Sequence, residues 1–280
     1  MQLLYQYDFN LEKVWPARYA SVPYMRAGSI YYAYNDGKNG IGTIKIEKGR
    51  QISQMLHVKD LLDYALPYRW RLFEFQNHVL LSCGNSDEPT EAFPDRRVCN
   101  VFLDLDDGMR KVSLPDEIAF QYQCRQPICE EKDAALSDVV MHYKSSRKYQ
   151  CLSPDGEVLW EEKHQGYRYT PFEVKNGCVI FGTAGMGGGL YCYDLQSGIR
   201  KIALRTLGTT RYVWVRDYIA CRGDKGQLVL VDPFAGKVMD ELQLDGMLTD
   251  ESGIIASDNQ ICVVGFHKKS QSPTVYLVEV

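Results

Sequence analysis

The feature that most constrains this chain is a repeat: a short apolar strand, a turn that contains glycine, and a second short strand. It is clearest in residues 190–204, LYCYDLQSGIRKIAL, and 228–242, LVLVDPFAGKVMDEL. The same pattern recurs at 102–114 and 149–160, and more weakly at 42–55. Glycine suits these turns because a tight hairpin requires positive φ, which strains a residue that carries a β-carbon. The turn glycines are Gly49, Gly108, Gly156, Gly198 and Gly236, separated by 59, 48, 42 and 38 residues.

Another strand pattern precedes each turn, and a sixth copy follows the last turn. Spacing of this kind predicts a β-propeller, in which four-stranded blades of about 40–50 residues repeat around an axis. The sixth unit ends at Thr274–Val280 before its outermost strand, and Gln2–Phe9 has the composition to supply that strand. Pairing the two ends would remove exposed sheet edges. The preceding strands are Ser29–Tyr34, His78–Cys83, Asp138–Tyr143, Cys178–Gly182, Tyr218–Arg222 and Gln260–Gly265.

The fold class that we predict is therefore all-β: residues 1–280 as a single closed β-propeller of six four-stranded blades, the N-terminal strand completing the last blade. A seventh blade stays possible because the first 120 residues match the repeat poorly. Long helical periodicity is nearly absent. Val58–Tyr64 and Glu130–Leu136 are the two segments that favour short helices, and both lie between repeat units.

Composition and charge limit the environment and the partners. The formal net charge of -4 gives no electrostatic reason to expect nucleic acid or an anionic membrane as the main partner. The first residues, MQLLYQYDFNLEKVW, lack a basic and apolar leader, and no apolar run reaches the ~18 residues of a spanning helix. Nine cysteines, several within apolar strands, favour reduced and buried thiols. We expect a cytoplasmic monomer.

Part of the chain resembles the repeat of PQQ-like, quinoprotein-type propellers. The residues that carry the resemblance are GGLYCYDLQSGIRKIAL, GQLVLVDPFAGKVMDELQL and SPDGEVLW, within about residues 150–245. In that repeat a strand ending in Asp precedes a glycine turn and a strand ending in Trp or an aliphatic residue. The quinoprotein dehydrogenases are exported enzymes with eight larger blades, a quinone and a calcium ion, whereas this chain is short and has no leader. The resemblance therefore implies the fold and not quinone chemistry.

Motifs that carry chemistry are weak in this sequence. The stretch Gly182–Gly189 is rich in glycine, but it lacks the Lys-Ser/Thr of a phosphate loop and fits a hairpin better. The five histidines show no metal-ligand spacing, and no G-x-S-x-G, H-E-x-x-H or Cys/His nucleophile arrangement is present. We predict no catalytic residues, no metal ligands and no cofactor.

An arginine beside an aromatic residue precedes most of the predicted blades. Because the innermost strand of a blade starts near these points, the arginines would gather at one mouth of the central channel and attract an anion or an acidic protein surface. The alternative is that each arginine packs along a neighbouring blade and pairs with a local carboxylate, with the aromatic residues in the core. The candidate binding residues are Arg18, Arg69, Trp70, Arg125, Arg168, Tyr169, Arg211, Tyr212 and Trp214.

These patterns favour a non-enzymatic module that binds another protein with one face of a rigid propeller, such as an inhibitor or an immunity-type protein. Two alternatives stay open. One is a metal-dependent hydrolase or lactonase, or a lyase, with its site in the central channel, although Glu173, Asp217 and Asn259 are scattered in the sequence. The other is a sensor of a small anionic ligand bound by the arginines.

Overall fold

The computed structural model describes residues 1–8, 23–35, 40–47, 50–57, 69–85, 99–122, 133–136, 139–145, 148–163, 167–168, 170, 172–185, 188–206, 211–246, 248, 253–266 and 273–280. These residues form six antiparallel sheets, which are numbered here in chain order. Short strands with apolar faces and tight turns produce this organisation, in which most strands pair antiparallel with the next strand along the chain. The chain is all-β, as predicted, and its four-stranded sheets are consistent with a propeller.

The six sheets have the following strands. The first sheet contains β2 (Tyr24–Arg26), β3 (Ser29–Asn35), β4 (Gly40–Glu47) and β5 (Arg50–His57). The second contains β6 (Arg69–Phe75), β7 (His78–Asn85), β8 (Cys99–Asp104) and β9 (Arg110–Val112). The third contains β10 (Asp133–Leu136), β11 (Val139–Ser145), β12 (Lys148–Leu152) and β13 (Val158–Lys163).

The fourth contains β14 (Tyr167–Arg168), β15 (Glu173–Lys175), β16 (Cys178–Ala184), β17 (Gly189–Asp194) and β18 (Arg200–Arg205), and β14 and β15 both pair with β16. The fifth contains β19 (Tyr212–Val215), β20 (Tyr218–Arg222), β21 (Leu228–Asp232) and β22 (Lys237–Leu242). The sixth contains β23 (Ile254–Ser257), β24 (Gln260–Phe266), β25 (Pro273–Glu279) and β1 (Gln2–Asp8).

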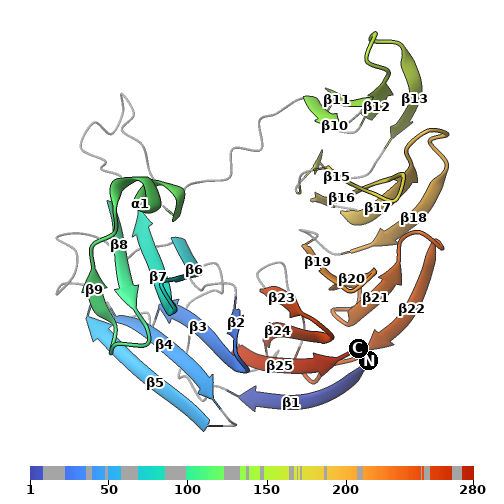
Figure 1. Ribbon diagram of the computed structural model, residues 1–280. Coiled ribbons are helices and arrows are strands. Elements are labelled where there is room, and N and C mark those ends of the chain that lie inside the picture. Colours follow the sequence, from blue (N-terminus) through green and yellow to red (C-terminus); the bar gives the residue numbers. More distant parts are fainter. Residues whose placement is uncertain are drawn as a thin grey trace.

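The sheets follow one another around an arc (Figure 1). The first strand of each sheet, for example β6, β10 and β19, lies on the inner side of the arc, and the last strand lies on the outer side. The sixth sheet adjoins the first, so the ends of the arc are the second and third sheets. The helix α1 (Asp116–Tyr122) lies at the end formed by the second sheet.

The predicted pairing of the two ends of the chain is confirmed. β1 runs antiparallel to β25, with Gln2 opposite Glu279 and Asp8 opposite Thr274. The Thr274 hydroxyl also donates a hydrogen bond of 2.7 Å to the Asp8 carboxylate. The N-terminal strand therefore completes the sixth sheet as its outermost strand.

The second strands of all six sheets lie where the sequence predicts them, within two residues at each end. The helix prediction at Glu130–Leu136 is wrong, because residues 133–136 form β10 and pair with β11. The helix prediction at Val58–Tyr64 lies outside the described residues. The helix that does form, α1, begins after Pro115 with Asp116 and Glu117, the residue types that favour a helix start. No helix in the described parts of the chain is long and apolar enough to cross a bilayer.

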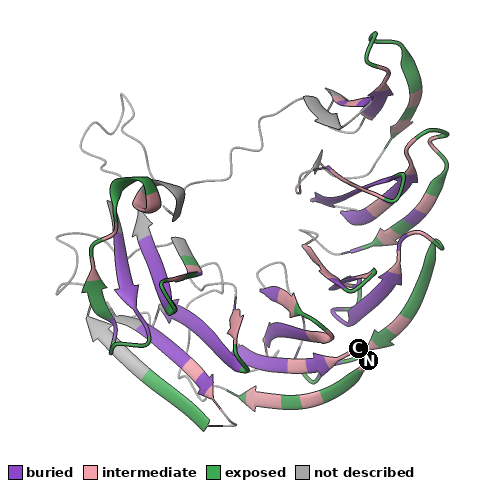
Figure 2. Ribbon diagram, viewed as in Figure 1, coloured by how far each residue is buried: buried purple, intermediate pink, exposed green. Residues whose placement is uncertain are grey.

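The core lies between successive sheets. Buried residues form the middle strands, while the outermost strands are largely exposed (Figure 2). Among the described residues, apolar clusters join the third sheet to the fourth, the fourth to the fifth, the fifth to the sixth, the sixth to the first, and the first to the second. The far face of the second sheet packs instead against α1, through Phe73, Leu80 and Phe102 with Ala119.

The cysteines confirm part of the sequence analysis. Six of the nine are buried thiols, and burial raises the pKa of the Cys221 and Cys262 thiols to about 12. A thiol with so high a pKa is protonated at neutral pH, so these residues act as small apolar side chains in the core. The six are Cys83, Cys151, Cys178, Cys192, Cys221 and Cys262.

The turn that ends the third strand of a sheet has the same construction in three sheets. Asp104, Asp194 and Asp232 each occupy the last position of that strand. The Oδ1 atom of Asp104 accepts backbone N–H groups two and three residues on, at 2.9 and 3.1 Å. Asp232 does the same at 3.0 and 2.9 Å, and Asp194 accepts the N–H three residues on at 2.9 Å. The aspartate of the repeat therefore stabilises the turn by local hydrogen bonds.

The glycine of this turn has positive φ in four sheets, at Gly108, Gly156, Gly198 and Gly236. In two of them it also touches the preceding sheet. A Cβ at Gly198 would lie 2.5 Å from the Trp160 side chain of β13, and one at Gly236 would lie 2.7 Å from the carbonyl oxygen of Lys201 in β18. The turn that contains Gly198 also accepts a hydrogen bond from β13, because Trp160 Nε1 donates to the Leu195 carbonyl at 2.8 Å. The turn glycine therefore also allows two sheets to approach closely.

We expect Gly198→Ala to destabilise the protein more than Gly108→Ala. Both variants place a Cβ at positive φ, which costs about 1–2 kcal/mol. Only the first also forces Cβ into Trp160, since a Cβ at Gly108 meets nothing within 4 Å. That overlap adds about 1–3 kcal/mol. Urea unfolding of both variants measures the difference, and equal losses would contradict close contact at Gly198.

Candidate functional site

Two of the predicted arginine–aromatic pairs lie at the start of innermost strands, and the arginine of a third pair lies on the short strand β14. Arg69 and Trp70 are the first residues of β6, Arg168 ends the short strand β14, and Arg211 directly precedes Tyr212 at the start of β19. Trp70 pairs with Cys83 and Tyr212 with Cys221, each near the end of the second strand that is far from the hairpin. The three sheets therefore present these segments at the same rim of the arc. Arg18, Arg125 and Tyr169 lie outside the described residues.

The three arginines do not share one register position. Arg69 is opposite Gly84, which lies six residues after the first residue of β7. Arg168 is opposite Thr183, which lies five residues after the first residue of β16. Arg211 comes one residue before Tyr212, whose partner Cys221 is three beyond the first residue of β20. A shift of one residue changes the face of the strand. The arginines thus share a rim without forming a regular ring.

Tyr212 and Trp214 are both half-buried, and both donate hydrogen bonds to Glu173 of the fourth sheet. The Tyr212 hydroxyl lies 3.1 Å from Glu173 Oε2, and Trp214 Nε1 lies 2.6 Å from Oε1. One carboxylate therefore joins β15 to β19. Burial, followed by the negative charge of Glu173 and its hydrogen bond, raises the pKa of Tyr212 above its usual value. The tyrosine accordingly stays protonated and remains a donor at neutral pH.

Two other side chains contact the Trp214 indole. The Lys175 ammonium lies 4.1 Å from the ring centroid, and the Phe234 ring stacks at 6.0 Å with an interplanar angle of 18°. Lys175 also lies 3.6 Å from the exposed carboxylate of Asp217. These contacts agree with the alternative that the aromatic residues pack between sheets. They also hold the strand that follows Arg211 in a fixed position.

A second polar cluster, which the sequence analysis missed, joins the first sheet to the second around Asp106. Asp106 Oδ1 accepts the Tyr31 hydroxyl at 2.8 Å and Lys45 Nζ at 2.9 Å. Oδ2 accepts the Val79 backbone N–H at 3.0 Å and Arg26 Nη1 at 3.3 Å. The Asp106 side chain is 17% exposed, so these charge-assisted bonds are partly shielded from water. The partners lie 27 to 80 residues away in sequence, so no local motif identifies them.

Charge and burial have opposite effects on the pKa values of Asp106 and Lys45 in this cluster. Burial alone would raise the pKa of Asp106, but the Val79 N–H, Lys45 and Tyr31 together hold that pKa below its usual value. Burial alone would lower the pKa of Lys45, whereas its bonds to Asp106 and Tyr31 raise that pKa above its usual value. The ion pair is therefore formed across the neutral range.

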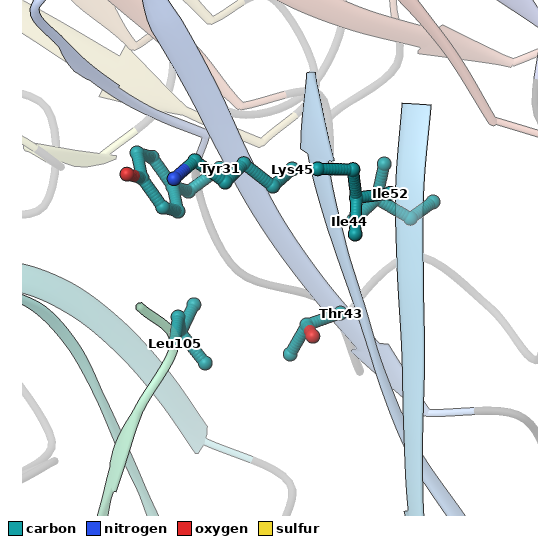
Figure 3. Close-up of a pocket in the computed structure, with 6 residues that line it drawn as sticks. All are labelled: Tyr31, Thr43, Ile44, Lys45, Ile52 and Leu105. Atoms are coloured by element: carbon teal, nitrogen blue, oxygen red, sulfur yellow. The ribbon is translucent and has the colours of Figure 1, made fainter. Parts of the chain in front are cut away.

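A small cavity adjoins this cluster between β3, β4 and the turn after β8 (Figure 3). Lys45 runs alongside the Tyr31 ring, with its ammonium 5.2 Å from the ring centroid. The cavity volume of about 20 Å³ accommodates one water molecule and no larger ligand. Its lining residues are Tyr31, Thr43, Ile44, Lys45, Ile52 and Leu105.

The glycine-rich stretch forms part of a hairpin, as the sequence analysis favours. β16 and β17 pair antiparallel across it, with Gly182 opposite Leu190. The Gly188 N–H donates to the Gly185 carbonyl at 3.0 Å, and the Gly189 N–H donates to Thr183 Oγ1 at 3.0 Å. In the parts of the chain that the structure describes, no group of three or more His, Cys, Asp or Glu residues is arranged to hold a metal ion.

Comparison with known proteins gives distant structural similarity. No protein-family model matches the chain, and no curated protein matches it. The computationally designed protein Ika4 is 17% identical with a TM-score of 0.37, over 53% of this chain and 89% of its own. The designed protein Ika8 is 13% identical with a TM-score of 0.36, over 92% of this chain and 71% of its own. BamB from Moraxella catarrhalis is 14% identical with a TM-score of 0.35, over 91% of this chain and 71% of its own. These values are low, and the fold described above rests on the strand pairing.

We expect Glu173→Ala to destabilise the protein by about 1–3 kcal/mol, because it leaves two partly buried donors, Tyr212 and Trp214, without their acceptor. Glu173→Gln keeps an oxygen that can accept one of the two hydrogen bonds, so we expect it to lower the free energy of unfolding by less. Urea unfolding measures both, with Glu157→Ala at an exposed turn as the control. If Glu173→Ala lowers the free energy of unfolding no more than Glu157→Ala does, Glu173 does not join the two sheets.

We expect the stability that Asp106 contributes to depend on pH in the acid range. A carboxyl whose pKa is lower in the folded state stabilises the protein above its ordinary value of 3.8, and this contribution is lost as pH falls through the folded value. The unfolding free energies of the wild type and Asp106→Asn should therefore differ most at pH 5–7 and converge below about pH 4. Asp107→Asn, at an exposed neighbour, is the matched control. A difference that is constant from pH 3 to pH 7 would contradict the assignment.

Proposed function

We propose that this protein is a non-enzymatic binding module that holds another protein at the rim where the innermost strands begin. One observation carries the proposal: Arg69–Trp70 and Arg211–Tyr212 open the innermost strands of two different sheets at the same rim. Arginine and large aromatic residues are the types that most often anchor protein interfaces. A carboxylate-bearing partner surface suits them, since guanidinium groups pair with carboxylates. An inhibitor or immunity-type role is one form of this function.

The contacts around Glu173 support the same proposal. Tyr212 and Trp214 are held by one carboxylate, and Lys175 and Phe234 both contact the indole ring of Trp214. A strand fixed in this way presents Arg211 with little freedom to lose on binding. Binding by a preorganised surface costs less entropy than binding by a mobile one.

We propose further that the sheets close into a six-bladed ring of the PQQ-like type. Five successive sheet pairs already share apolar clusters among the described residues. The repeated aspartate–glycine turn fits that repeat. Closure would fix the rim segments of the second and fourth sheets relative to each other.

Affinity capture from the native cell tests the binding function. The wild type should retain a specific protein, and the double variant Arg69→Ala/Arg211→Ala should lose it. With the purified partner, we expect the double variant to bind at least about tenfold more weakly, which corresponds to 1.4 kcal/mol. Arg50→Ala is the matched control, because Arg50 is exposed at the start of the outermost strand β5.

Two results would contradict the proposal. One is unchanged binding by the double variant when its urea unfolding matches that of the wild type. The other is the absence of any specifically retained protein. In that second case, a rise in Tm with small anionic metabolites would favour the ligand-sensor alternative.

A further inference from the structure

Two cysteines lie close together on the face of the fourth sheet that packs against the fifth sheet. In the pairing of β16 with β17, Cys178 is opposite Asp194 and Cys192 is opposite Ile180, so the two cysteines are diagonal neighbours on one face. Both are fully buried free thiols of the same apolar cluster. The two thiol groups are hydrogen-bonded to each other. The sheet therefore holds two soft sulfur atoms within reach of one bound atom.

A lysine ammonium group lies against this pair of thiols. Lys201 Nζ donates a hydrogen bond to the Cys178 sulfur. It lies 3.9 Å from Asp194 Oδ2, which is beyond hydrogen-bond distance. The other oxygen of that carboxylate, Oδ1, accepts the backbone N–H and the hydroxyl of Ser197. The Lys201 side chain is 30% exposed, so it connects the buried thiols with the surface.

A β-bulge places the lysine at this position. The pairing of β17 with β18 shifts by one residue, so that Lys201 has no opposite residue in the ladder. The outermost strands of the third and fifth sheets have a bulge at the same place, where the residues without an opposite residue are Leu159 and Met239. Both are apolar, so the packing of the sheets does not require a charge at this position.

The arrangement suits a negative charge on the sulfur atoms. A neutral thiol is a weak hydrogen-bond acceptor, whereas an ionised acceptor forms a strong bond with an ammonium group. A monovalent cation held by two thiolates gives a unit with one negative charge, and Lys201 supplies the positive charge that neutralises it. This pairing matters because a buried charge is stable only when it is compensated.

We propose that Cys178 and Cys192 form a binding site for one soft monovalent cation of the Cu(I) type, and that Lys201 neutralises the bound complex. Thiolates are the ligands that select Cu(I), and two are sufficient because this ion accepts linear, two-coordinate binding. Binding exchanges two thiol protons for one ion: Cu⁺ and 2 RSH give [Cu(SR)₂]⁻ and 2 H⁺. The site lies between the fourth and fifth sheets and is separate from the rim arginines.

Two other uses of a thiol pair fit the geometry less well. A disulfide requires Cα atoms within about 7 Å of each other, and diagonal neighbours lie about 7–8 Å apart. A bound ion extends the reach, because each metal–thiolate bond adds about 2.3 Å. Structural Zn²⁺ takes four ligands, and the described residues contain no group of three or more His, Cys, Asp or Glu that could hold it. The geometry therefore favours an ion of low coordination number.

Competition with a chromophoric Cu(I) chelator, under anaerobic and reducing conditions, tests the site. The wild type should take up one more equivalent of Cu(I) than the double variant Cys178→Ala/Cys192→Ala. Cys83→Ala/Cys262→Ala is the matched control, because it removes the same number of buried thiols from other clusters, and it should bind as the wild type does. Cu(I) should also raise the Tm of the wild type more than that of Cys178→Ala/Cys192→Ala.

A substitution of the lysine gives a second readout that leaves both thiols in place. Lys201→Met should weaken Cu(I) binding at least about tenfold, because the bound complex loses its neutralising charge. Arg200→Met removes a charge from the adjacent exposed residue and should leave the affinity unchanged. Equal Cu(I) uptake by the wild type and Cys178→Ala/Cys192→Ala would overturn the proposal, and so would equal affinities of Lys201→Met and Arg200→Met. Neither readout involves the rim arginines, so loss of this site and loss of partner binding are separate results.

Discussion

The structure depends on apolar packing between successive sheets, because no single sheet of this size buries enough surface to be stable alone. Tyr31 and Tyr32, adjacent in β3, show how this works. Tyr31 packs toward the second sheet, and Tyr32 packs toward the sixth. Each strand thus contributes to two interfaces through its alternating residues. The stability of any sheet is therefore tied to that of its neighbours, as in other repeat proteins.

Polar contacts at the same interfaces add geometric specificity to this packing. Asp106 joins the second sheet to Tyr31 and Lys45 of the first, and Glu173 joins the fourth sheet to Tyr212 and Trp214 of the fifth. Apolar surfaces slide with little penalty, whereas hydrogen bonds to a partly buried carboxylate require one arrangement. The two carboxylates set how adjacent sheets meet. Glu173 also holds β19, the strand that follows Arg211 at the rim.

The sequence predicted the features that depend on local signals. The turn glycines and the second strands were recognisable because hairpin chemistry acts over a few residues, and the β1–β25 pairing followed from an incomplete last unit. The sequence predicts a short helix over Glu130–Leu136, yet residues 133–136 form a strand, because their pairing with β11 decides their structure. The Asp106 cluster was missed because its partners are far away in sequence. The engagement of Trp214 by Glu173, 41 residues away, was hidden for the same reason.

The pairing of β1 with β25 has a consequence for folding during synthesis. At about 5–20 residues per second, roughly 15–50 s separate the appearance of the two strands. Throughout that interval the growing chain carries an unpaired strand, whose Leu3 and Tyr5 are exposed even in the finished fold. Such an edge is a template for intermolecular pairing. Nascent chains therefore carry this unpaired edge until the seven-residue strand β25 emerges, and a chaperone that shields β1 until then would protect them.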